Sequence, residues 1–187
     1  MIISRAPLRM SFVGGGSDLP AFYNINGGAV LSTTIDKYIY VNVNKKFDEG
    51  IRVAYSKTEL VDNVEELDHE LVKASLKYLK INNGIEITSI ADIPSMGTGL
   101  GSSSTFTTAL LHVLNAYKGK FISKQKLAID SCIIEIDKCN QPIGKQDQFA
   151  AAFGGFNLIE FNKDNKVNVT PIIANNKTFT NINKNLL

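Results

Sequence analysis

A loop of glycine and serine runs directly into an amphipathic helix pattern in the stretch PSMGTGLGSSSTFTTALLHVL, which begins at Pro94. Beyond the loop, apolar residues recur at the i, i+3, i+4, i+7 spacing of one helix face. They are Phe106, Ala109, Leu110, Val113, Leu114 and Tyr117. A helix N-terminus has unpaired amide groups and a partial positive charge, so it attracts anions, and phosphate most readily.

The loop residues strengthen this interpretation. Glycines remove side chains that would keep an anion from the backbone, and serines add hydroxyl donors at the helix start. The residues expected to bind phosphate are Gly97, Gly99, Leu100, Gly101, Ser102, Ser103 and Ser104. The loop is not of the Walker A type, because no lysine follows its last glycine. The alternative is an ordinary flexible turn with a serine N-cap, and the loop alone does not decide between the two.

Composition and charge narrow the class of protein. The chain has 187 residues, of which 44% are hydrophobic, and this suits one globular domain with a sizeable core. The net charge is only +2 and the basic residues are dispersed, which argues against a nucleic-acid partner. Cys132 and Cys139 form neither a CxxC pair nor a disulfide framework, so we expect core packing in a reducing compartment. The N-terminus does not resemble a signal peptide and no run is long enough to span a membrane, so we expect a cytoplasmic protein.

The order of the expected elements indicates an α+β fold. Strands are predicted at 8–14, 28–35, 38–44, 51–55, 85–93 and 154–161. Helices are predicted from Val64 to the NNG stop at 82–84, over 106–117, from an N-cap at Ser123 to about 139, and over 145–153. Strands come first and helices gather later, which favours a sheet covered on one face by helices over an alternating α/β arrangement.

Two further stretches carry charged residues in unusual settings. In RAPLRMSFVGGGSDLPAFY, a strand with Arg5 and Arg9 enters a triple-glycine turn followed by Asp18, as expected where backbone and a carboxylate approach a polyhydroxyl ligand. In IEIDKCNQPIGKQDQFAAAFGG, Glu135 lies between isoleucines and Asp147 follows a Pro and Gly turn. A glutamate in an apolar helix either reaches the surface or has a partner such as a metal ion or a basic group. The spacing leaves both open.

These three stretches together resemble the GHMP kinases, the superfamily of galactokinase, homoserine kinase and mevalonate kinase. PSMGTGLGSSST is similar to their phosphate-binding motif, APLRMSFVGGGSD to their first motif, and GKQDQFAAAFGG to the segment that holds their catalytic aspartate. Within the superfamily, the N-terminal stretch most resembles the D-glycero-D-manno-heptose 7-phosphate kinases, and the resemblance extends to about Phe161. Galactokinases carry glutamate and histidine where this chain has Gly15 and Gly16, so galactose itself is disfavoured.

The resemblance implies a role for each matching residue. Asp147 matches the catalytic base and Arg9 the basic residue beside it, which would keep Asp147 ionised. Ser103 and Glu135 match the positions that hold Mg²⁺. The substrate-binding candidates are Asp18, Arg5, Gly15 and Gly16, with Arg5 the weaker one for an anionic sugar phosphate.

The implied reaction is transfer of the γ-phosphoryl group of ATP, with Mg²⁺, to the anomeric hydroxyl of a heptose 7-phosphate. Fucose- or galactose-like acceptors are the alternatives within the kinases. We expect the N-terminal domain of such a kinase over residues 1–170 and a polar tail that could be disordered over 171–187.

Length keeps a second hypothesis open. GHMP kinases have two domains, and this chain ends where the second would begin. A truncated or split-gene product could bind nucleotide without being a competent kinase, and its uncovered apolar surface would bind a partner chain or a second copy. A sugar-binding or RNA-binding module is disfavoured, because Asp147, Glu135 and the loop would then have no shared purpose.

Overall fold

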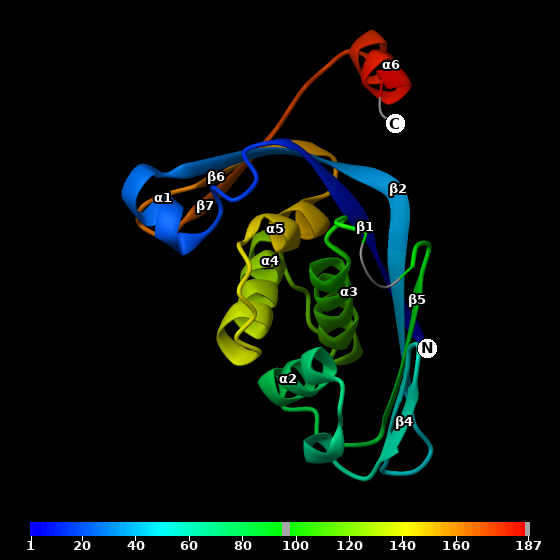
Figure 1. The fold of residues 1–187 in the computed structure, drawn as a ribbon. Coiled ribbons are helices and arrows are strands. Elements are labelled where there is room, and N and C mark those ends of the chain that lie inside the picture. The colour runs from blue at the N-terminus through cyan, green and yellow to red at the C-terminus, as the bar shows by residue number, and fades with distance from the viewer. Residues whose placement is uncertain (95–97, 186–187) are drawn as a thin grey trace.

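The computed structural model describes residues 1–94 and 98–185, and their strands form one mixed sheet (Figure 1). The strands are β1 (Ile2–Val13), β2 (Gly28–Lys45), β3 (Ile51–Ala54), β4 (Thr58–Val61), β5 (Ile85–Ala91), β6 (Phe156–Phe161) and β7 (Val167–Pro171). Their order is β4-β3-β5-β2-β6-β7, with β1 paired to β2. Strands β3 and β5 run parallel, and the other pairs are antiparallel.

One long strand, β2, organises the sheet. We expected two strands, 28–35 and 38–44, but the extended backbone continues through the exposed residues Asp36 and Lys37. The first part of β2 pairs with β6 and the last part with β5, while β1 runs antiparallel along the other side. A single strand therefore links the two ends of the sheet.

Four helices cover one face of this sheet, as predicted (Figure 1). They are α2 (Glu70–Leu79), α3 (Ser102–Tyr117), α4 (Lys124–Cys132) and α5 (Gln146–Phe153). The largest apolar core lies between α2, α3 and the inward side chains of β1, β2, β3 and β5. Of the apolar stripe predicted for α3, Ala109, Leu110, Val113 and Leu114 are buried there.

Two predicted helices are divided differently in the structure. The pattern that starts at Val64 forms a short 3-10 helix, η1 (Val64–Glu66), before α2 begins at Glu70. The pattern from Ser123 to 139 forms α4 and then a π-helical turn, η2 (Ile133–Lys138). Ser123 is the N-cap as predicted, because its hydroxyl accepts a hydrogen bond from the Lys126 amide at 3.2 Å. Such π-turns are frequent at functional sites, and this one carries Glu135.

Four elements of the structure were not predicted from the sequence. Strands β4 and β7 are only four and five residues long, too short to show a reliable alternation. Helix α1 (Pro20–Asn26) starts with a proline in its first turn and lies beside β6 and β7 (Figure 1). Helix α6 (Asn176–Asn185) lies within the segment that we expected to be a polar tail.

Helix α6 is attached by few contacts. None of its residues is buried, and Phe179 meets Phe156 edge to face with ring centroids 6.2 Å apart. The domain boundary at residue 170 remains a prediction. Among the described residues, no helix combines the length and apolar character needed to cross a bilayer.

Candidate active site

The glycine and serine loop ends at the N-terminus of α3, as the sequence predicted. Gly101 is the N-cap residue, with a φ of 75° in the left-handed region that favours glycine. No side chain caps this helix end, so the amides of its first turn face a small cavity instead of a capping group. Gly97 lies outside the described residues.

Arg9 of β1 fixes the loop in place. Its backbone amide donates to the Leu100 carbonyl at 3.2 Å, and its side-chain NH1 donates to the Gly99 carbonyl at 2.9 Å. These bonds occupy the carbonyl groups of the loop and leave its amide groups for a ligand. The loop therefore presents donors to the cavity, which suits an anion.

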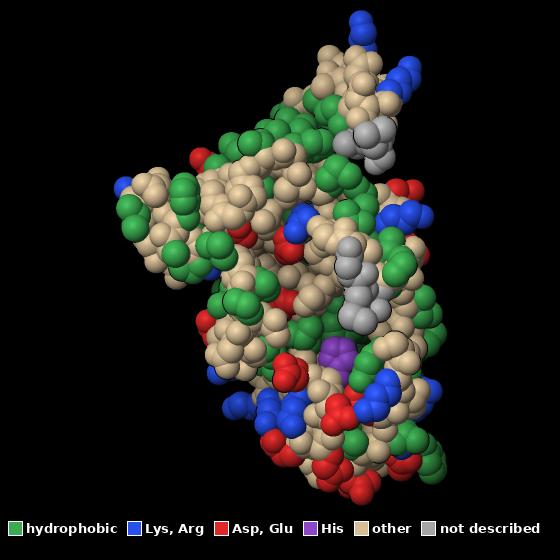
Figure 2. Space-filling model, in the orientation of Figure 1, with side chains coloured by type: hydrophobic (Ala, Val, Ile, Leu, Met, Phe, Trp, Pro, Cys, Tyr) green, Lys and Arg blue, Asp and Glu red, His purple; other side chains and the backbone are tan. Residues whose placement is uncertain are grey.

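Asp147, in the first turn of α5, forms an ion pair with Arg9. The Asp147 Oδ1 accepts from Arg9 Nε at 2.7 Å and lies 2.7 Å from NH2, so two nitrogens of the guanidinium contact one oxygen. The side chains are 23% and 13% exposed respectively, so the pair is sheltered but still open to a ligand. In Figure 2, acidic and basic side chains lie together in the hollow in the middle of this face.

The loop and the aspartate touch. A Cβ atom added to Gly101 would lie 3.0 Å from Asp147 Oδ2, tighter than most Cβ contacts in proteins. Glycine at this position thus allows the carboxylate to approach the start of α3. A phosphate bound by the helix N-terminus would lie next to Asp147.

The electrostatics of Asp147 differ from our expectation. Burial raises the pKa of its carboxyl, while the charge and hydrogen bond of Arg9 oppose that rise and the nearby Asp18 adds to it. We expected Arg9 to keep Asp147 ionised, and it acts in that direction, but the pKa remains raised. A raised pKa suits a carboxylate that must take up a proton during a reaction.

Asp18 lies on the other side of the start of α5. It is 3% exposed, and its carboxylate accepts from the Gln146 amide at 3.1 Å and from the Gln146 side chain at 3.3 Å. A Cβ atom on Gly144 would lie 1.9 Å from Asp18 Oδ2, so only glycine fits there. Gln146 also accepts from the Ser11 hydroxyl at 2.7 Å and thereby connects Asp18 to β1.

Glu135 is fully buried, which excludes the surface position that the sequence left open. Its Oε1 accepts from the Ser103 hydroxyl at 2.7 Å and its Oε2 accepts from the Gln148 side chain. Burial raises the pKa of Glu135, and hydrogen bonds from Ser103, Ser104, Gln148 and Thr107 oppose the rise. A buried acid with several donors is typical of a functional group rather than of a packing residue.

The donor set around Glu135 fits Mg²⁺, a hard cation that prefers hydroxyl and carboxylate oxygens. Ser103 supplies a hydroxyl, and the buried Gln148 Oε1 has no hydrogen-bond partner among the described residues. Residues 1–94 and 98–185 contain no group of three or more His, Cys, Asp and Glu side chains that could hold a metal alone. A cation here would take its other ligands from phosphate and water, as Mg²⁺ commonly does.

Three of the substrate-binding candidates lie apart from the ion pair. Gly15 and Gly16 are exposed, and an added Cβ atom on either would meet nothing within 4 Å, so there is open space beside the triple-glycine turn. Arg5 lies elsewhere, because its neighbours Ser4 and Ala6 are buried and its guanidinium stacks on Tyr38 at 4.3 Å. The structure does not bring Arg5 to the cluster of Arg9, Asp18 and Asp147.

Two cavities flank the start of α3. The smaller, of about 260 Å³, is lined by the loop, Ser104 and Asp147. The larger, of about 410 Å³, includes His69, Phe106 and Ile90 among its lining residues. Ser102 and Ser103 belong to both linings, so the two spaces adjoin.

Three residues that contact the acids of the site were not predicted from the sequence. They are Gly144, Gln146 and Gln148. Gln148 is fully buried in α5, but it follows Gln146 and Asp147 directly, so its polarity gave no distinct signal. Gly144 and Gln146 act through contacts with Asp18, which lies more than a hundred residues away in the chain. No local pattern reports such a contact.

The family model described as the GHMP kinases N terminal domain matches residues 53–155, which include the loop, Glu135 and Asp147. The chain belongs to the GHMP kinases. This confirms the resemblance read from the three motifs and the fold class that it implied.

Relatives of this GHMP kinase chain include sugar kinases. It is 30% identical to a D-glycero-alpha-D-manno-heptose 7-phosphate kinase of Campylobacter jejuni, over 94% of this chain and 55% of the relative. It is 25% identical to an L-fucokinase/L-fucose-1-P guanylyltransferase of Bacteroides fragilis, over 86% of this chain and 20% of that protein. The chain thus spans about half the length of the heptose kinase and 20% of the length of the second relative.

A solved structure shows the same fold. The crystal structure of a D-glycero-D-manno-heptose 1-phosphate kinase from Bacteroides thetaiotaomicron superposes with a TM-score of 0.87 at 30% identity. The match covers 94% of this chain and 61% of that one. Together these relatives support a sugar kinase of the GHMP family.

Proposed function

We propose that this chain is the part of an ATP-dependent sugar kinase that binds the nucleotide phosphates and carries the catalytic base. The observation that carries the proposal is the Arg9–Asp147 ion pair beside the uncapped N-terminus of α3. A general base and a phosphate-binding helix end in one cavity are what phosphoryl transfer to a hydroxyl requires.

Asp147 would accept the proton of the attacking hydroxyl. It needs to lie within hydrogen-bond reach of that hydroxyl, and its place between the loop and Asp18 allows this. Arg9 holds the carboxylate in one orientation through two contacts and puts a positive charge next to the transferring phosphoryl group.

The nucleotide would extend from the loop into the cavity of about 410 Å³. This cavity adjoins the phosphate site through Ser102 and Ser103 and offers aromatic and aliphatic walls suited to a base. His69 stacks on Phe106 there, with centroids 5.2 Å apart. Ser103 and Glu135 would hold Mg²⁺, which neutralises the charge on the phosphates when it is bound.

The acceptor would lie beside Asp18 and the open space at Gly15 and Gly16. Asp18 uses its carboxylate oxygens for Gln146, but each oxygen can accept more than one bond, so sugar hydroxyls could donate to it as well. Similarity to the heptose 7-phosphate kinase supports the anomeric hydroxyl of a heptose 7-phosphate as the acceptor. Fucose is the alternative that the second relative supports.

The test is release of ADP by the purified chain with ATP and Mg²⁺, against heptose 7-phosphate, fucose, galactose and mevalonate. We expect turnover with heptose 7-phosphate that Asp147→Asn abolishes. The matched control is Asp62→Asn, which changes an exposed carboxylate remote from the loop. Turnover unchanged in Asp147→Asn would refute the role of the base.

A partner chain or second copy remains a prediction, because the chain spans only part of its relatives. If the chain binds ATP but shows no turnover, the same assay should be repeated with the C-terminal half of a related heptose kinase added. Restored turnover that depends on Asp147 would support the half-enzyme hypothesis.

A further inference from the structure

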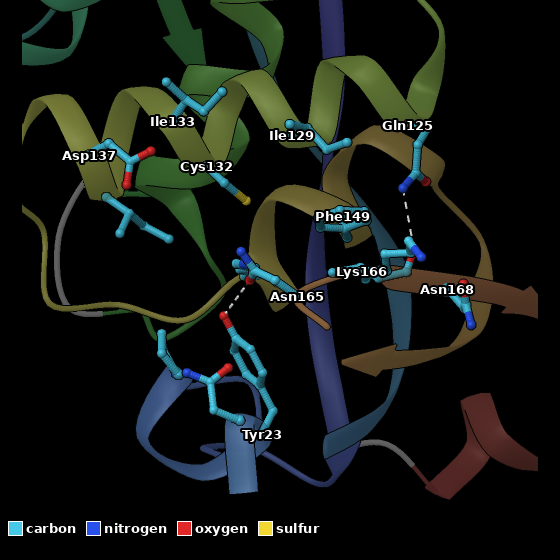
Figure 3. A pocket seen from close by; sticks show the side chains of 15 residues that line it. Tyr23, Gln125, Ile129, Cys132, Ile133, Asp137, Phe149, Asn165, Lys166 and Asn168 are labelled. Atoms are coloured by element: carbon cyan, nitrogen blue, oxygen red, sulfur yellow. Dashed lines mark hydrogen bonds between the residues drawn. The ribbon is translucent and has the colours of Figure 1, made fainter. Parts of the chain in front are cut away.

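A cavity separate from those at the loop lies behind α5, the helix that carries Asp147. It has a volume of about 650 Å³, within the range of small-molecule sites, and is bounded by α1, α4, η2, α5 and the turn between β6 and β7 (Figure 3). It shares no lining residue with either cavity at the loop. A ligand here would not touch the reacting groups.

Helix geometry explains why the cavity is separate. Lys145 and Phe149 line it from one face of α5, while Asp147, between them in sequence, points to the opposite face and Arg9. On η2, Ile133 and Ile136 line the cavity, while Glu135 turns toward Ser103. The two elements that carry Asp147 and Glu135 thus form the wall between the cavities.

The floor of the cavity is apolar. Figure 3 shows Cys132 of α4 and Phe149 of α5 pointing into it, and Ile129 and Ile133 also line it. Ile129 remains 40% exposed although it lies at a concave site. An apolar body of the size of two fused rings would cover these side chains.

Lys145 is held in this cavity by an amide oxygen and an aromatic ring. The Lys145 ammonium donates to Asn165 Oδ1 and lies 5.1 Å from the centre of the Tyr23 ring, and Tyr23 also donates to Asn165 at 2.9 Å. Within residues 1–94 and 98–185, Lys145 pairs with no carboxylate, whereas Lys166 pairs with Asp164 at 2.8 Å. Two of the three ammonium hydrogens of Lys145 therefore have no acceptor fixed by the fold.

We propose that this cavity is a second ligand site, which binds an amphipathic anion with its apolar body on the isoleucines and Phe149 and its charge on Lys145. Asn24, Gln125 and Asn168 also line the cavity, and the Gln125 side chain donates to the Val167 carbonyl at 3.3 Å. Asp137 is the one carboxylate in the lining, and it lies on the side away from Gln125 (Figure 3). The proposal does not rest on kinase activity, because it concerns a separate cavity and binding alone.

The probe is 2-naphthoate, with 2-naphthamide as its neutral counterpart of the same shape. The chain contains no tryptophan, so naphthalene fluorescence can be followed without an indole background. We expect 1:1 binding of naphthoate to the full chain, about tenfold tighter than naphthamide because a charge-assisted hydrogen bond is added. Saturating ATP should leave both affinities unchanged.

Variants separate this site from adventitious binding. Lys145→Met should reduce the affinity for naphthoate to that for naphthamide, and Lys145→Arg should restore it. Lys163→Met, an exposed lysine in the turn between β6 and β7 that is outside the lining, is the matched control and should have no effect. Asn24→Phe, on the exposed rim, should block both probes without adding an indole. Equal affinity for the two probes, loss of binding with ATP, or an unchanged Lys145→Met variant would overturn the proposal.

Discussion

The contact between Gly144 and Asp18 allows a sharp test of how the acceptor side of the site is built. In Gly144→Ala, the new Cβ atom would lie 1.9 Å from Asp18 Oδ2 and 2.2 Å from its Cγ. The backbone at Gly144 does not have a positive φ, so alanine is excluded by this contact and not by backbone strain. The carboxylate of Asp18 must move.

The magnitude follows from what the movement breaks. Asp18 loses one or both of its bonds from Gln146, and a hydrogen bond to a charged group contributes about 1.5–3 kcal/mol. Forcing a methyl group into a packed site adds about 1–3 kcal/mol. Because partial rotation relieves some of each effect, we expect a loss of about 3 kcal/mol of unfolding free energy, which is about 6–12 °C in Tm for a chain of this size.

Thermal unfolding and urea titration measure this loss, and Gly15→Ala is the control. An added Cβ atom at Gly15 meets nothing within 4 Å and its φ is not positive, so this variant should be as stable as the native chain or slightly more stable. The decisive variant combines Gly144→Ala with Asp18→Ala. Since the clash needs the carboxylate, the double variant should be no less stable than Asp18→Ala alone. Additive losses, or a Gly144→Ala as stable as Gly15→Ala, would refute the contact.

Three further predictions concern the helix cap, the metal site and the half-buried His69. Ser123→Ala removes the N-cap bond of α4 and should lower the unfolding free energy by about 1 kcal/mol in a urea titration; a loss below a few tenths would contradict the cap. Mg²⁺ with ADP should raise the Tm of the native chain more than that of Glu135→Gln, with the exposed Glu49→Gln behaving as native; equal gains in all three would argue against Glu135 as a ligand. Burial lowers the pKa of His69, so the folded chain favours the neutral imidazole. The stability that this provides is present above the unfolded pKa of 6.5 and is lost as the pH falls below 6.5. His69→Phe should therefore gain stability over the native chain as the pH is lowered from about 7.5 to about 5.5, and a constant difference in urea midpoint would contradict this.

Much of the fold could be predicted because its signals are local. The period of α3, the serine cap of α4 and the β-branched runs of β1 and β2 each depend on residues a few positions apart. The predictions that differed from the structure concern where a strand begins, ends or continues. Whether 28–35 and 38–44 are one strand depends on β1, β5 and β6, which pair with both parts. The short strand β4 forms because it pairs with β3, and its four residues contain no local pattern that predicts this pairing.

The sequence by itself determined which residues are candidates for the site, and the resemblance to the GHMP kinases suggested their roles. The glycine and serine loop, Arg9, Asp147 and Glu135 could be named from residue types and their neighbours, because anion binding by a helix end and the cost of a buried acid are local rules. The family match then included two of the three motifs, the loop and the segment around Asp147.

Only the tertiary structure decided which of these residues meet. Arg9 and Asp147 are 138 positions apart and Ser103 and Glu135 are 32 apart, and side-chain direction rather than spacing brings them together. The directions of the side chains also place Arg5 away from the site. They bring Gly144, Gln146 and Gln148 into contact with its acids. Lys145 points away from Asp147 and lines a second cavity. Contacts between distant segments follow from packing the whole chain, so no stretch of the sequence contains them alone.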